Sequence, residues 1–296
     1  MVREHKREKN HSEAVRESLK AKRKSIINPI VRAKDFGEVT FLDKDINKNY
    51  IYMVIPCYNE KQNLPQLINN LSHVLSGISP FEIIVVDDGS SDGSDVLLKK
   101  LASKYPINLL RHDQNMGLSS TLIDGLLFAI SISRADDLII TMDADNTHKS
   151  FYIRDMIETA NEGADVVIAS RYIDGGFQVG VSKDRILLSK FANILLNFLS
   201  GLKIKDLTSG FRCYRASVLK KVLRKYDSHF IDARGFEVQA ELLIKLNFVS
   251  KRIREMPFKL RYDEKQGASK MPLFKTINNY IRLSLKTIVW RRQKNN

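Results

Sequence analysis

From about residue 50 onward, short apolar runs alternate with longer mixed segments. The runs IYMVIP, FEIIVVD, INLLRH, DLIITMD and DVVIAS are too short for most helices and are rich in Ile and Val. We interpret each as a strand buried on both faces. Helix-length segments lie between them, among them residues 60–75, 94–105 and 117–133. This alternation predicts an α/β fold with a mainly parallel sheet flanked by helices.

Carboxylates follow two of the predicted strands. Asp87 and Asp88 end one apolar run, and Asp143 and Asp145 come directly after another. Ligands of open parallel sheets bind beyond the carboxyl ends of the strands, so these side chains are expected to converge. Four carboxylates at one edge repel one another unless a cation or several hydrogen-bond donors compensate them. No GxGxxG follows the first strand and no GxxxxGK[ST] occurs, which argues against dinucleotide dehydrogenases and P-loop enzymes.

Composition adds a strong positive charge. The chain has 296 residues, a formal charge of +14 and a pI near 9.6, which favours anionic partners such as nucleic acid, an acidic membrane face or phosphorylated substrates. Residues 1–34 hold eleven Lys and Arg against four Glu, half of the net charge. This extension is either a solvated basic helix or partly disordered tail, or an anchor to anionic lipid or a partner. Without aromatic interleaving, no nucleic-acid partner is expected.

Cysteine content and hydropathy indicate the compartment. Cys57 and Cys213 are far apart and have no metal-type spacing, so neither a disulfide framework nor a zinc site is expected. The first residues lack the apolar core of a secretory signal, and no run of about 18 uncharged apolar residues occurs. We therefore expect a reducing, cytosolic location without a membrane span.

Six motifs occur in a fixed order: VIPCYNEKQNL, VVDDGSSDGS, NMGLSSTLIDGL, MDADNTH, SRY and DLTSGFRCYR. Together they resemble glycosyltransferase family 2, and within it the polyprenyl-phosphate (dolichol-phosphate) mannosyltransferases and their glucosyl relatives. The resemblance covers about residues 50–270. It implies a nucleotide-diphospho-sugar transferase fold of the GT-A type, with a nucleotide-sugar donor.

The resemblance also implies a donor pocket. Pro56, Tyr58 and Glu60 would line the base and ribose site, and Asp88 would accept a hydrogen bond from the base. Asp87 has two open interpretations, a turn-shaping residue or a ligand contact, because Asp and Ser are favoured in turns.

The segment MDADNTH resembles the family's DxD motif. Asp143, Ala144 and Asp145 would contact the donor, with Asp143 and Asp145 binding Mg²⁺ or Mn²⁺ and Asp145 as the principal ligand. Hard carboxylate oxygens suit these ions, which neutralise charge on a departing nucleoside diphosphate. His148 is expected to be structural, and Cys57 to be a small buried residue.

Further along, Arg171, Arg185 and Ser189 match positions that surround the lipid phosphate in the polyprenyl-phosphate enzymes. Arginine binds phosphate oxygens bidentately and keeps its charge. The alternative for either arginine is an ordinary surface ion pair.

Two amphipathic segments accompany these residues. Residues 187–202 combine polar positions every three or four residues with a wide apolar face. Such a helix is either deeply buried or lies in a bilayer interface, and the neighbouring phosphate-binding candidates favour the membrane. Residues 272–296 repeat the pattern with Trp290 and a basic end.

The chain departs from the family pattern at three points. Thr147 stands where an amide is common, Val181 replaces a common Trp, and Glu264 occupies the first position of an R-x-x-G-x-S-K loop. Lys265 is a candidate substitute there, and Lys270 remains as the diphosphate-binding lysine. These changes leave the sugar open.

The sequence therefore predicts three segments: a basic extension at 1–48, a GT-A domain at 49–270 and an amphipathic basic helix at 271–296. The leading hypothesis is a metal-dependent inverting enzyme that transfers a hexose from a GDP- or UDP-sugar to polyprenyl phosphate. It would act peripherally at the cytoplasmic face of a membrane, by itself or with a membrane-anchoring subunit. The alternatives are a family 2 transferase acting on a saccharide hydroxyl and a nucleotide-sugar-binding scaffold.

Overall fold

The computed structural model describes residues 28–31, 49–264 and 273–295. Its main sheet has eight strands in the order β1-β4-β3-β2-β5-β8-β6-β9. The strands are β1 (Asn28–Val31), β2 (Ile51–Cys57), β3 (Phe81–Asp87), β4 (Ile107–Arg111), β5 (Leu138–Thr141), β6 (Val166–Ser170), β8 (Arg212–Arg215) and β9 (Ile253–Pro257). Pairing is parallel from β4 through β5 and between β6 and β9, whereas β1 and β8 run antiparallel to their neighbours. The predicted mainly parallel sheet is confirmed.

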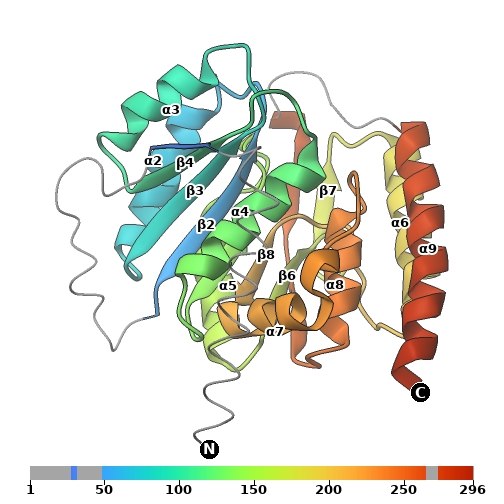
Figure 1. The fold of residues 1–296 in the computed structure, drawn as a ribbon. Helices are drawn as coiled ribbons and strands as arrows, with labels where there is room; N and C mark the ends of the chain where they lie inside the picture. The colour runs from blue at the N-terminus through green and yellow to red at the C-terminus, as the bar shows by residue number, and fades with distance from the viewer. Residues whose placement is uncertain (1–27, 32–48, 265–272, 296) are drawn as a thin grey trace, which may run out of the picture.

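Helices cover both faces of the sheet (Figure 1). They are α2 (Leu64–Ser76), α3 (Ser94–Ala102), α4 (Leu118–Ile132), α5 (Tyr152–Asn161), α6 (Lys183–Ser200), α7 (Ala216–Tyr226), α8 (Val238–Asn247) and α9 (Leu273–Asn295). Short 3-10 turns occupy η3 (Asp227–His229) and η4 (Tyr262–Glu264), and a small two-stranded sheet pairs β7 (Phe177–Val179) with β10 (Lys259–Arg261).

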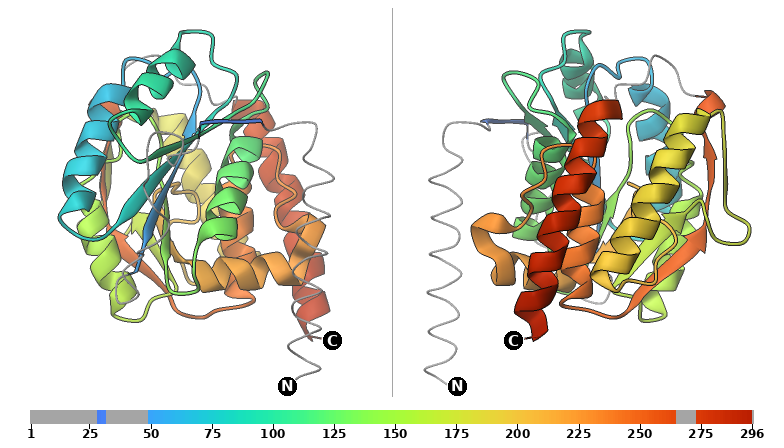
Figure 2. Two further views of the ribbon diagram at one scale, coloured as in Figure 1. Left: turned by 60° about the vertical axis from the view of Figure 1, so that its left-hand side comes forward. Right: turned by 90° about the vertical axis from the view of Figure 1, so that its right-hand side faces the viewer.

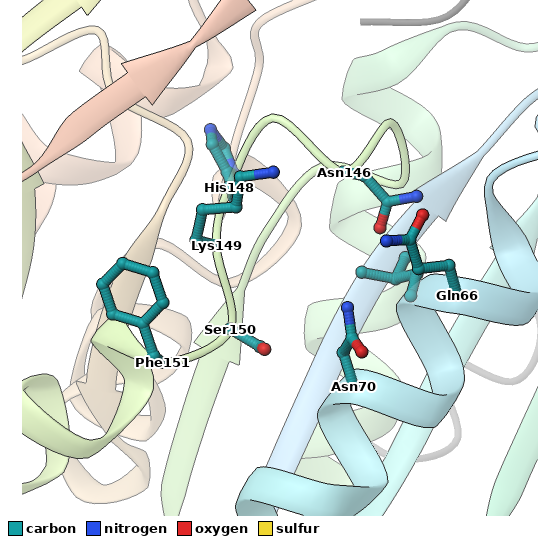
Figure 3. A pocket seen from close by; sticks show the side chains of 8 residues that line it. Gln66, Asn70, Asn146, His148, Lys149, Ser150 and Phe151 are labelled. Atoms are coloured by element: carbon teal, nitrogen blue, oxygen red, sulfur yellow. The ribbon is translucent and has the colours of Figure 1, made fainter. Parts of the chain in front are cut away.

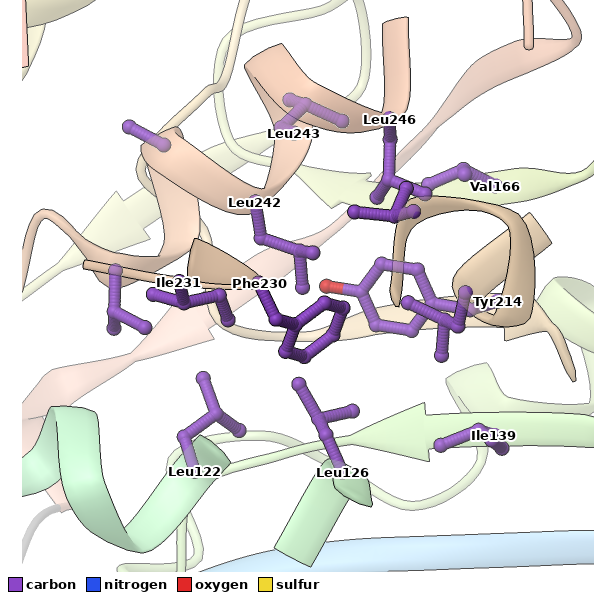
Figure 4. Packing of buried hydrophobic residues seen from close by; sticks show 14 of the residues in the cluster. Leu122, Leu126, Ile139, Val166, Tyr214, Phe230, Ile231, Leu242, Leu243 and Leu246 are labelled. Carbon is purple, nitrogen blue, oxygen red and sulfur yellow. The ribbon is translucent and has the colours of Figure 1, made fainter. Parts of the chain in front are cut away.

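Alternate residues of the central strands enter two separate cores. In β2, Tyr52 and Val54 pack with α4, α7 and α8, whereas Ile51, Met53 and Ile55 pack with α2, α3 and α5. Figure 4 shows part of the first core, where side chains of α4 and α8 enclose those of the strands and of Phe230. Because these strands are buried on both faces, their sequences are nearly continuous apolar runs.

The N-terminal extension is not wholly a tail. Residues Asn28–Val31 lie within the predicted extension 1–48, yet they pair antiparallel with β4 at the edge of the sheet. The interpretation of this region as a basic helix or tail is wrong for these four residues, because the sheet edge offers unpaired backbone groups that a strand can satisfy. The rest of the extension lies outside the described residues.

Helices α6 and α9 stand side by side at one end of the molecule, drawn in yellow and red (Figures 1 and 2). Arg291 of α9 donates to the carbonyl oxygens of Phe198 and Leu199 in α6, at 3.3 and 3.2 Å. Among the helices that the structure describes, none is both long and apolar enough to cross a bilayer.

Candidate active site

The carboxyl ends of β2 to β6 and the start of β8 meet at one edge of the sheet. The loops after β2 and β3 are fastened together there. The Asn59 amide N–H donates to Ser90 Oγ at 2.9 Å, and the Ser91 N–H donates to Asn59 Oδ1 at 2.9 Å. Pro56, Tyr58 and Glu60, which are close to Asn59 in the sequence, are half-buried. Their predicted contacts with base and ribose stay predictions.

Asp88 is 3% exposed and held by three donors. Its carboxylate contacts His112 Nδ1 at 2.6 Å and accepts from the amide N–H groups of Met116 and Gly117 at 2.8 and 2.9 Å. Burial alone would raise the pKa of Asp88, but these bonds outweigh it and lower the pKa. Asp88 thus ties the end of β3 to the loop before α4, and its role in reading the base stays a prediction.

His112 is a site residue that sequence reasoning missed. It is fully buried at the end of β4, and its Nε2 lies 3.1 Å from Asp124 Oδ2 while its Nδ1 contacts Asp88. Burial alone would lower the pKa of His112, but the bonds and charges of Asp124 and Asp88 raise it to about 9. The imidazolium is therefore the buried cation between two carboxylates. Its spacing from Asp124 on an adjacent predicted helix is the signal that could have drawn attention to it.

Asp87 shapes the turn after β3, as one of the two interpretations predicted. Its Oδ1 accepts from the Ser90 N–H at 3.3 Å, and its Oδ2 lies 3.5 Å from Arg111 Nε. Burial raises the pKa of Asp87 more than these contacts lower it.

The two aspartates of the DxD segment differ in exposure. The Asp143 side chain is 49% exposed, whereas Asp145 is 5% exposed. Between them, Ala144 is buried. Thr147 donates to Asp145 Oδ1 through its hydroxyl at 2.7 Å and its amide at 3.2 Å. Thr147 therefore orients Asp145, which is a different task from the one an amide would have at this position.

The donor set of this segment fits a hard divalent cation, although protein carboxylates alone would not complete its shell. Within the described ranges, no group of three or more His, Cys, Asp or Glu side chains could hold a metal. Mg²⁺ is commonly bound by one or two carboxylates together with substrate phosphates. Asp143 and Asp145 meet that pattern if a diphosphate supplies the other oxygens.

His148 has the structural role expected of it. Its ring stacks on Phe211 with centroids 5.1 Å apart and meets Phe258 edge-on at 5.3 Å. Its Nδ1 accepts from the Asp143 N–H at 3.1 Å, so the ring supports the DxD backbone.

Glu264, which stands at a position where arginine is usual, contacts two cations. Lys149 Nζ donates to its Oε2, and Arg261 lies 3.1 Å from its Oε1. This acidic side chain is therefore neutralised by cations from two other places in the chain. The predicted lysines Lys265 and Lys270 lie outside the described residues.

Arg171 is paired inside the protein. Its guanidinium holds Asp206 bidentately, Nε to Oδ2 and Nη2 to Oδ1, both at 2.8 Å, and also donates to Thr208 Oγ1 at 2.7 Å. Burial alone would lower the pKa of Arg171, but Asp206 outweighs it and raises the pKa. The Arg171 side chain is 14% exposed and that of Asp206 is fully buried, so the two do not form an ordinary surface ion pair.

Ser189 joins this group through α6. Its hydroxyl lies 2.7 Å from Thr208 Oγ1, so Arg171, Thr208 and Ser189 form one polar chain. Arg185 lies one helical turn earlier and donates to the Tyr262 hydroxyl at 3.0 Å. The structure therefore brings Arg171 and Ser189 together and places Arg185 on the same helical face as Ser189.

Helix α6 is not buried on all sides. It buries Ala192, Asn193, Leu196 and Ser200 and exposes an apolar stripe that is 60% to 78% accessible. Helix α9 exposes a second apolar stripe, with one residue every four positions. We call the two together the α6–α9 surface: Leu187, Phe191, Ile194, Phe198, Ile277, Ile281, Leu285 and Val289. Exposed apolar patches of this extent mark interaction sites.

A small pocket opens between helix α2 and the loop that follows the DxD segment (Figure 3). Gln66 and Asn70 of α2 lie with Asn146 on one side of it, and Lys149 and Phe151 lie on the other. None of the predicted donor or acceptor residues is among the described residues that line it. The strand ends, rather than this pocket, therefore hold the candidate active site.

A family model described as "Glycosyl transferase family 2" matches residues 52–223. The chain belongs to glycosyltransferase family 2. It is similar to a polyprenol monophosphomannose synthase of Mycolicibacterium smegmatis, 32% identical over 222 residues that cover 74% of this chain and 80% of the relative. It is also similar to a dolichol-phosphate mannosyltransferase of Pyrococcus furiosus, 33% identical over 81% of this chain and 64% of the relative. The recognised family and the glycosyltransferase class are confirmed.

Solved structures support the GT-A-like fold of this family member. Glucosyl-3-phosphoglycerate synthase of Mycobacterium tuberculosis, in a complex with Mn²⁺, UDP and phosphoglyceric acid, matches with a TM-score of 0.58 at 18% identity, over 82% of this chain and 79% of that one. The complex of that enzyme with Mg²⁺ and UDP also matches with a TM-score of 0.58, at 17% identity. Identity this low supports the fold alone.

Proposed function

We propose that this family 2 glycosyltransferase transfers a hexose from a GDP- or UDP-sugar to a polyprenyl phosphate, with inversion at the anomeric carbon. The observation that carries the proposal is the position of the Arg171–Thr208–Ser189 chain beside helix α6, whose exposed stripe is apolar. A phosphate attached to a long apolar chain matches both features. Relatives named as polyprenol- and dolichol-phosphate enzymes support the same acceptor.

On the acceptor side, the residues would orient a nucleophile that already carries charge. A phosphate monoester has a second pKa near 6, so at neutral pH it is largely a dianion and needs no general base. Arg171 is held rigidly by Asp206, and Arg185 reaches from the same helix as Ser189. These groups would point a phosphate oxygen at the anomeric carbon of the donor.

On the donor side, Asp143 and Asp145 would hold Mg²⁺ or Mn²⁺, which when bound neutralises charge on the leaving nucleoside diphosphate. The half-buried residues Pro56, Tyr58 and Glu60 would receive base and ribose. Asp88, fixed by His112, would present its remaining acceptor capacity to the base. Lys270, outside the described residues, would contact the diphosphate.

The α6–α9 surface would dock on the membrane that contains the acceptor. Apolar stripes on two neighbouring helices place about eight large side chains where acyl chains could cover them. The basic residues 1–27, which hold nine Lys and Arg against four Glu, would add attraction to anionic lipid. We propose in addition that attachment is peripheral and at the cytoplasmic face, by the chain itself or together with an anchoring subunit.

The test offers radiolabelled GDP-mannose and UDP-glucose, each with Mg²⁺ or Mn²⁺, to three acceptors: polyprenyl phosphate, polyprenol and an oligosaccharide. The proposal expects labelled lipid from polyprenyl phosphate and none from polyprenol, since polyprenol lacks the phosphate. Product with the oligosaccharide alone would favour a hydroxyl acceptor, and donor binding without any transfer would favour a nucleotide-sugar-binding scaffold.

A further inference from the structure

Gln239 carries a buried amide that the proposed mechanism does not use. It is the second residue of α8, and its side chain belongs to a residue that is 6% exposed. Its Oε1 has no hydrogen-bond partner among the described residues. Buried polar atoms normally have a partner, so an exception calls for an explanation such as a ligand.

Gly210 places this amide beside the DxD segment. A Cβ atom at Gly210 would lie 3.4 Å from Gln239 Nε2 and 3.6 Å from Asp143 Oδ1. The amide and the carboxylate therefore border the same small space from two different elements. The Thr141 hydroxyl donates to the Gly210 carbonyl oxygen at 2.8 Å, which fixes this glycine against the end of β5.

Arg212 fixes the backbone of Gln239 from below. This fully buried guanidinium donates to the carbonyl oxygens of Gln239 and Leu207, at 2.5 and 2.6 Å. The start of α8 is thereby held against β8 and the loop before it. A half turn of the carboxamide exchanges its oxygen and nitrogen, and among the described residues no hydrogen bond holds Oε1 in its present orientation.

The geometry points to Gln239 as a further ligand of the donor-site cation, through its amide oxygen. This inference rests on the proposed function and deepens its donor site. Amide oxygens are hard ligands that suit Mg²⁺ and Mn²⁺. Position 147, where an amide is common in the family, is a threonine, and its hydroxyl donates to Asp145. Helix α8 instead supplies an amide, that of Gln239, on the other side of Gly210 from Asp143.

The test measures Mn²⁺ binding by the full chain in the presence of GDP, and in a parallel series UDP, from the electron paramagnetic resonance signal of free Mn²⁺. Gln239→Leu should weaken Mn²⁺ binding at least tenfold, and Gln239→Glu, which keeps an oxygen ligand, should stay within threefold of the wild type. Gly210→Ala keeps the glutamine but fills the space between it and Asp143, and should also weaken binding. Circular dichroism melting and nucleotide binding in EDTA check that each variant is folded.

Three results would overturn the assignment. Binding by Gln239→Leu within twofold of the wild type would remove Gln239 from the cation shell. Equal weakening by Gln239→Glu and Gln239→Leu would show that the amide N–H, not the oxygen, matters. If Gln239→Leu does not fold, wild-type affinity in Gly210→Ala would refute the shared space. Wild-type protein that binds nucleotide but no Mn²⁺ would instead refute the proposed metal role.

Discussion

The proposed donor side of the site consists of polar groups at the ends of strands that are buried on both faces, whereas the proposed acceptor side lies along helices that expose apolar side chains. On the donor side Asp88, His112 and Asp145 are each 5% exposed or less. On the acceptor side Phe191 and Phe198 are 60% and 78% exposed. A deep polar site holds a charged, soluble ligand by fixed contacts, while an apolar surface holds a lipid loosely and by area.

The two sides also balance charge differently. The donor side contains an excess of carboxylates, which His112 offsets in part between Asp88 and Asp124. The proposed acceptor side pairs Arg171 with Asp206, and Arg185 donates to the Tyr262 hydroxyl. Substitutions on the two sides should therefore have different effects: some should change the transfer rate, some the free energy of unfolding, and some the binding to membranes.

The largest effect is expected at Asp145. Asp145→Asn should reduce transfer at saturating donor by about 10³-fold or more, because it weakens the charge stabilisation of the leaving diphosphate. The measurement is the initial rate of labelled product formation, with melting temperature as the check on folding. Asp155→Asn, at an exposed position in the first turn of helix α5, is the matched control and should retain the wild-type rate. A fully active Asp145→Asn would remove the DxD segment from the donor side.

A smaller effect, on stability, is expected at His112. The pKa of His112 is raised to about 9 from its usual 6.5, so the folded state binds this proton more tightly than the unfolded state. The resulting stabilisation is fully present below pH 6.5 and is lost as pH rises through about 9. It amounts to about 3 kcal/mol.

This pH dependence can be isolated by comparing unfolding free energies of the wild type and His112→Asn between pH 6 and pH 10. The difference between the two proteins should shrink by about 3 kcal/mol as pH rises. A difference that stays constant over this range would mean that folding does not raise the pKa of His112.

The smallest effect per residue is expected on the α6–α9 surface. Phe191→Gln and Phe198→Gln should each weaken binding to vesicles of phosphatidylcholine and phosphatidylglycerol by about five- to tenfold, about 1 kcal/mol, without changing nucleotide binding. Phe151→Gln changes an aromatic residue that is also 60% exposed but lies beside the DxD loop, and it should bind vesicles like the wild type. Vesicle sedimentation measures all three. Equal loss in all three variants would show that general surface hydrophobicity, not this surface, drives binding.

Local pattern was sufficient for most of the fold. The five predicted strands and the helices near 64–76, 94–102 and 118–132 are confirmed. A strand buried on both faces has a continuous apolar run, and a helix buried on one face has apolar residues every three or four positions, so both can be recognised in the sequence. Strand Arg212–Arg215 was not predicted as a strand. It is short and charged at both ends, and it is a strand because β5 and β6 both pair with it.

The candidate site also contains residues that the sequence identifies and pairs that only the structure reveals. Asp88, Asp143, Asp145, Arg171 and Ser189 could be named from motifs, since each motif keeps its chemistry within a few residues. His112 with Asp124, and Arg171 with Asp206, come together only when separate elements pack.

By itself, the sequence determined the family, the parallel α/β frame and the carboxylates at the strand ends, because these depend on short-range pattern and order. Tertiary structure alone decided which charges neutralise one another, which face of α6 stays exposed and that Gln239 borders Asp143 across Gly210. Pairing and burial depend on distances between residues far apart in the chain, and those distances exist only once the helices have packed on the sheet.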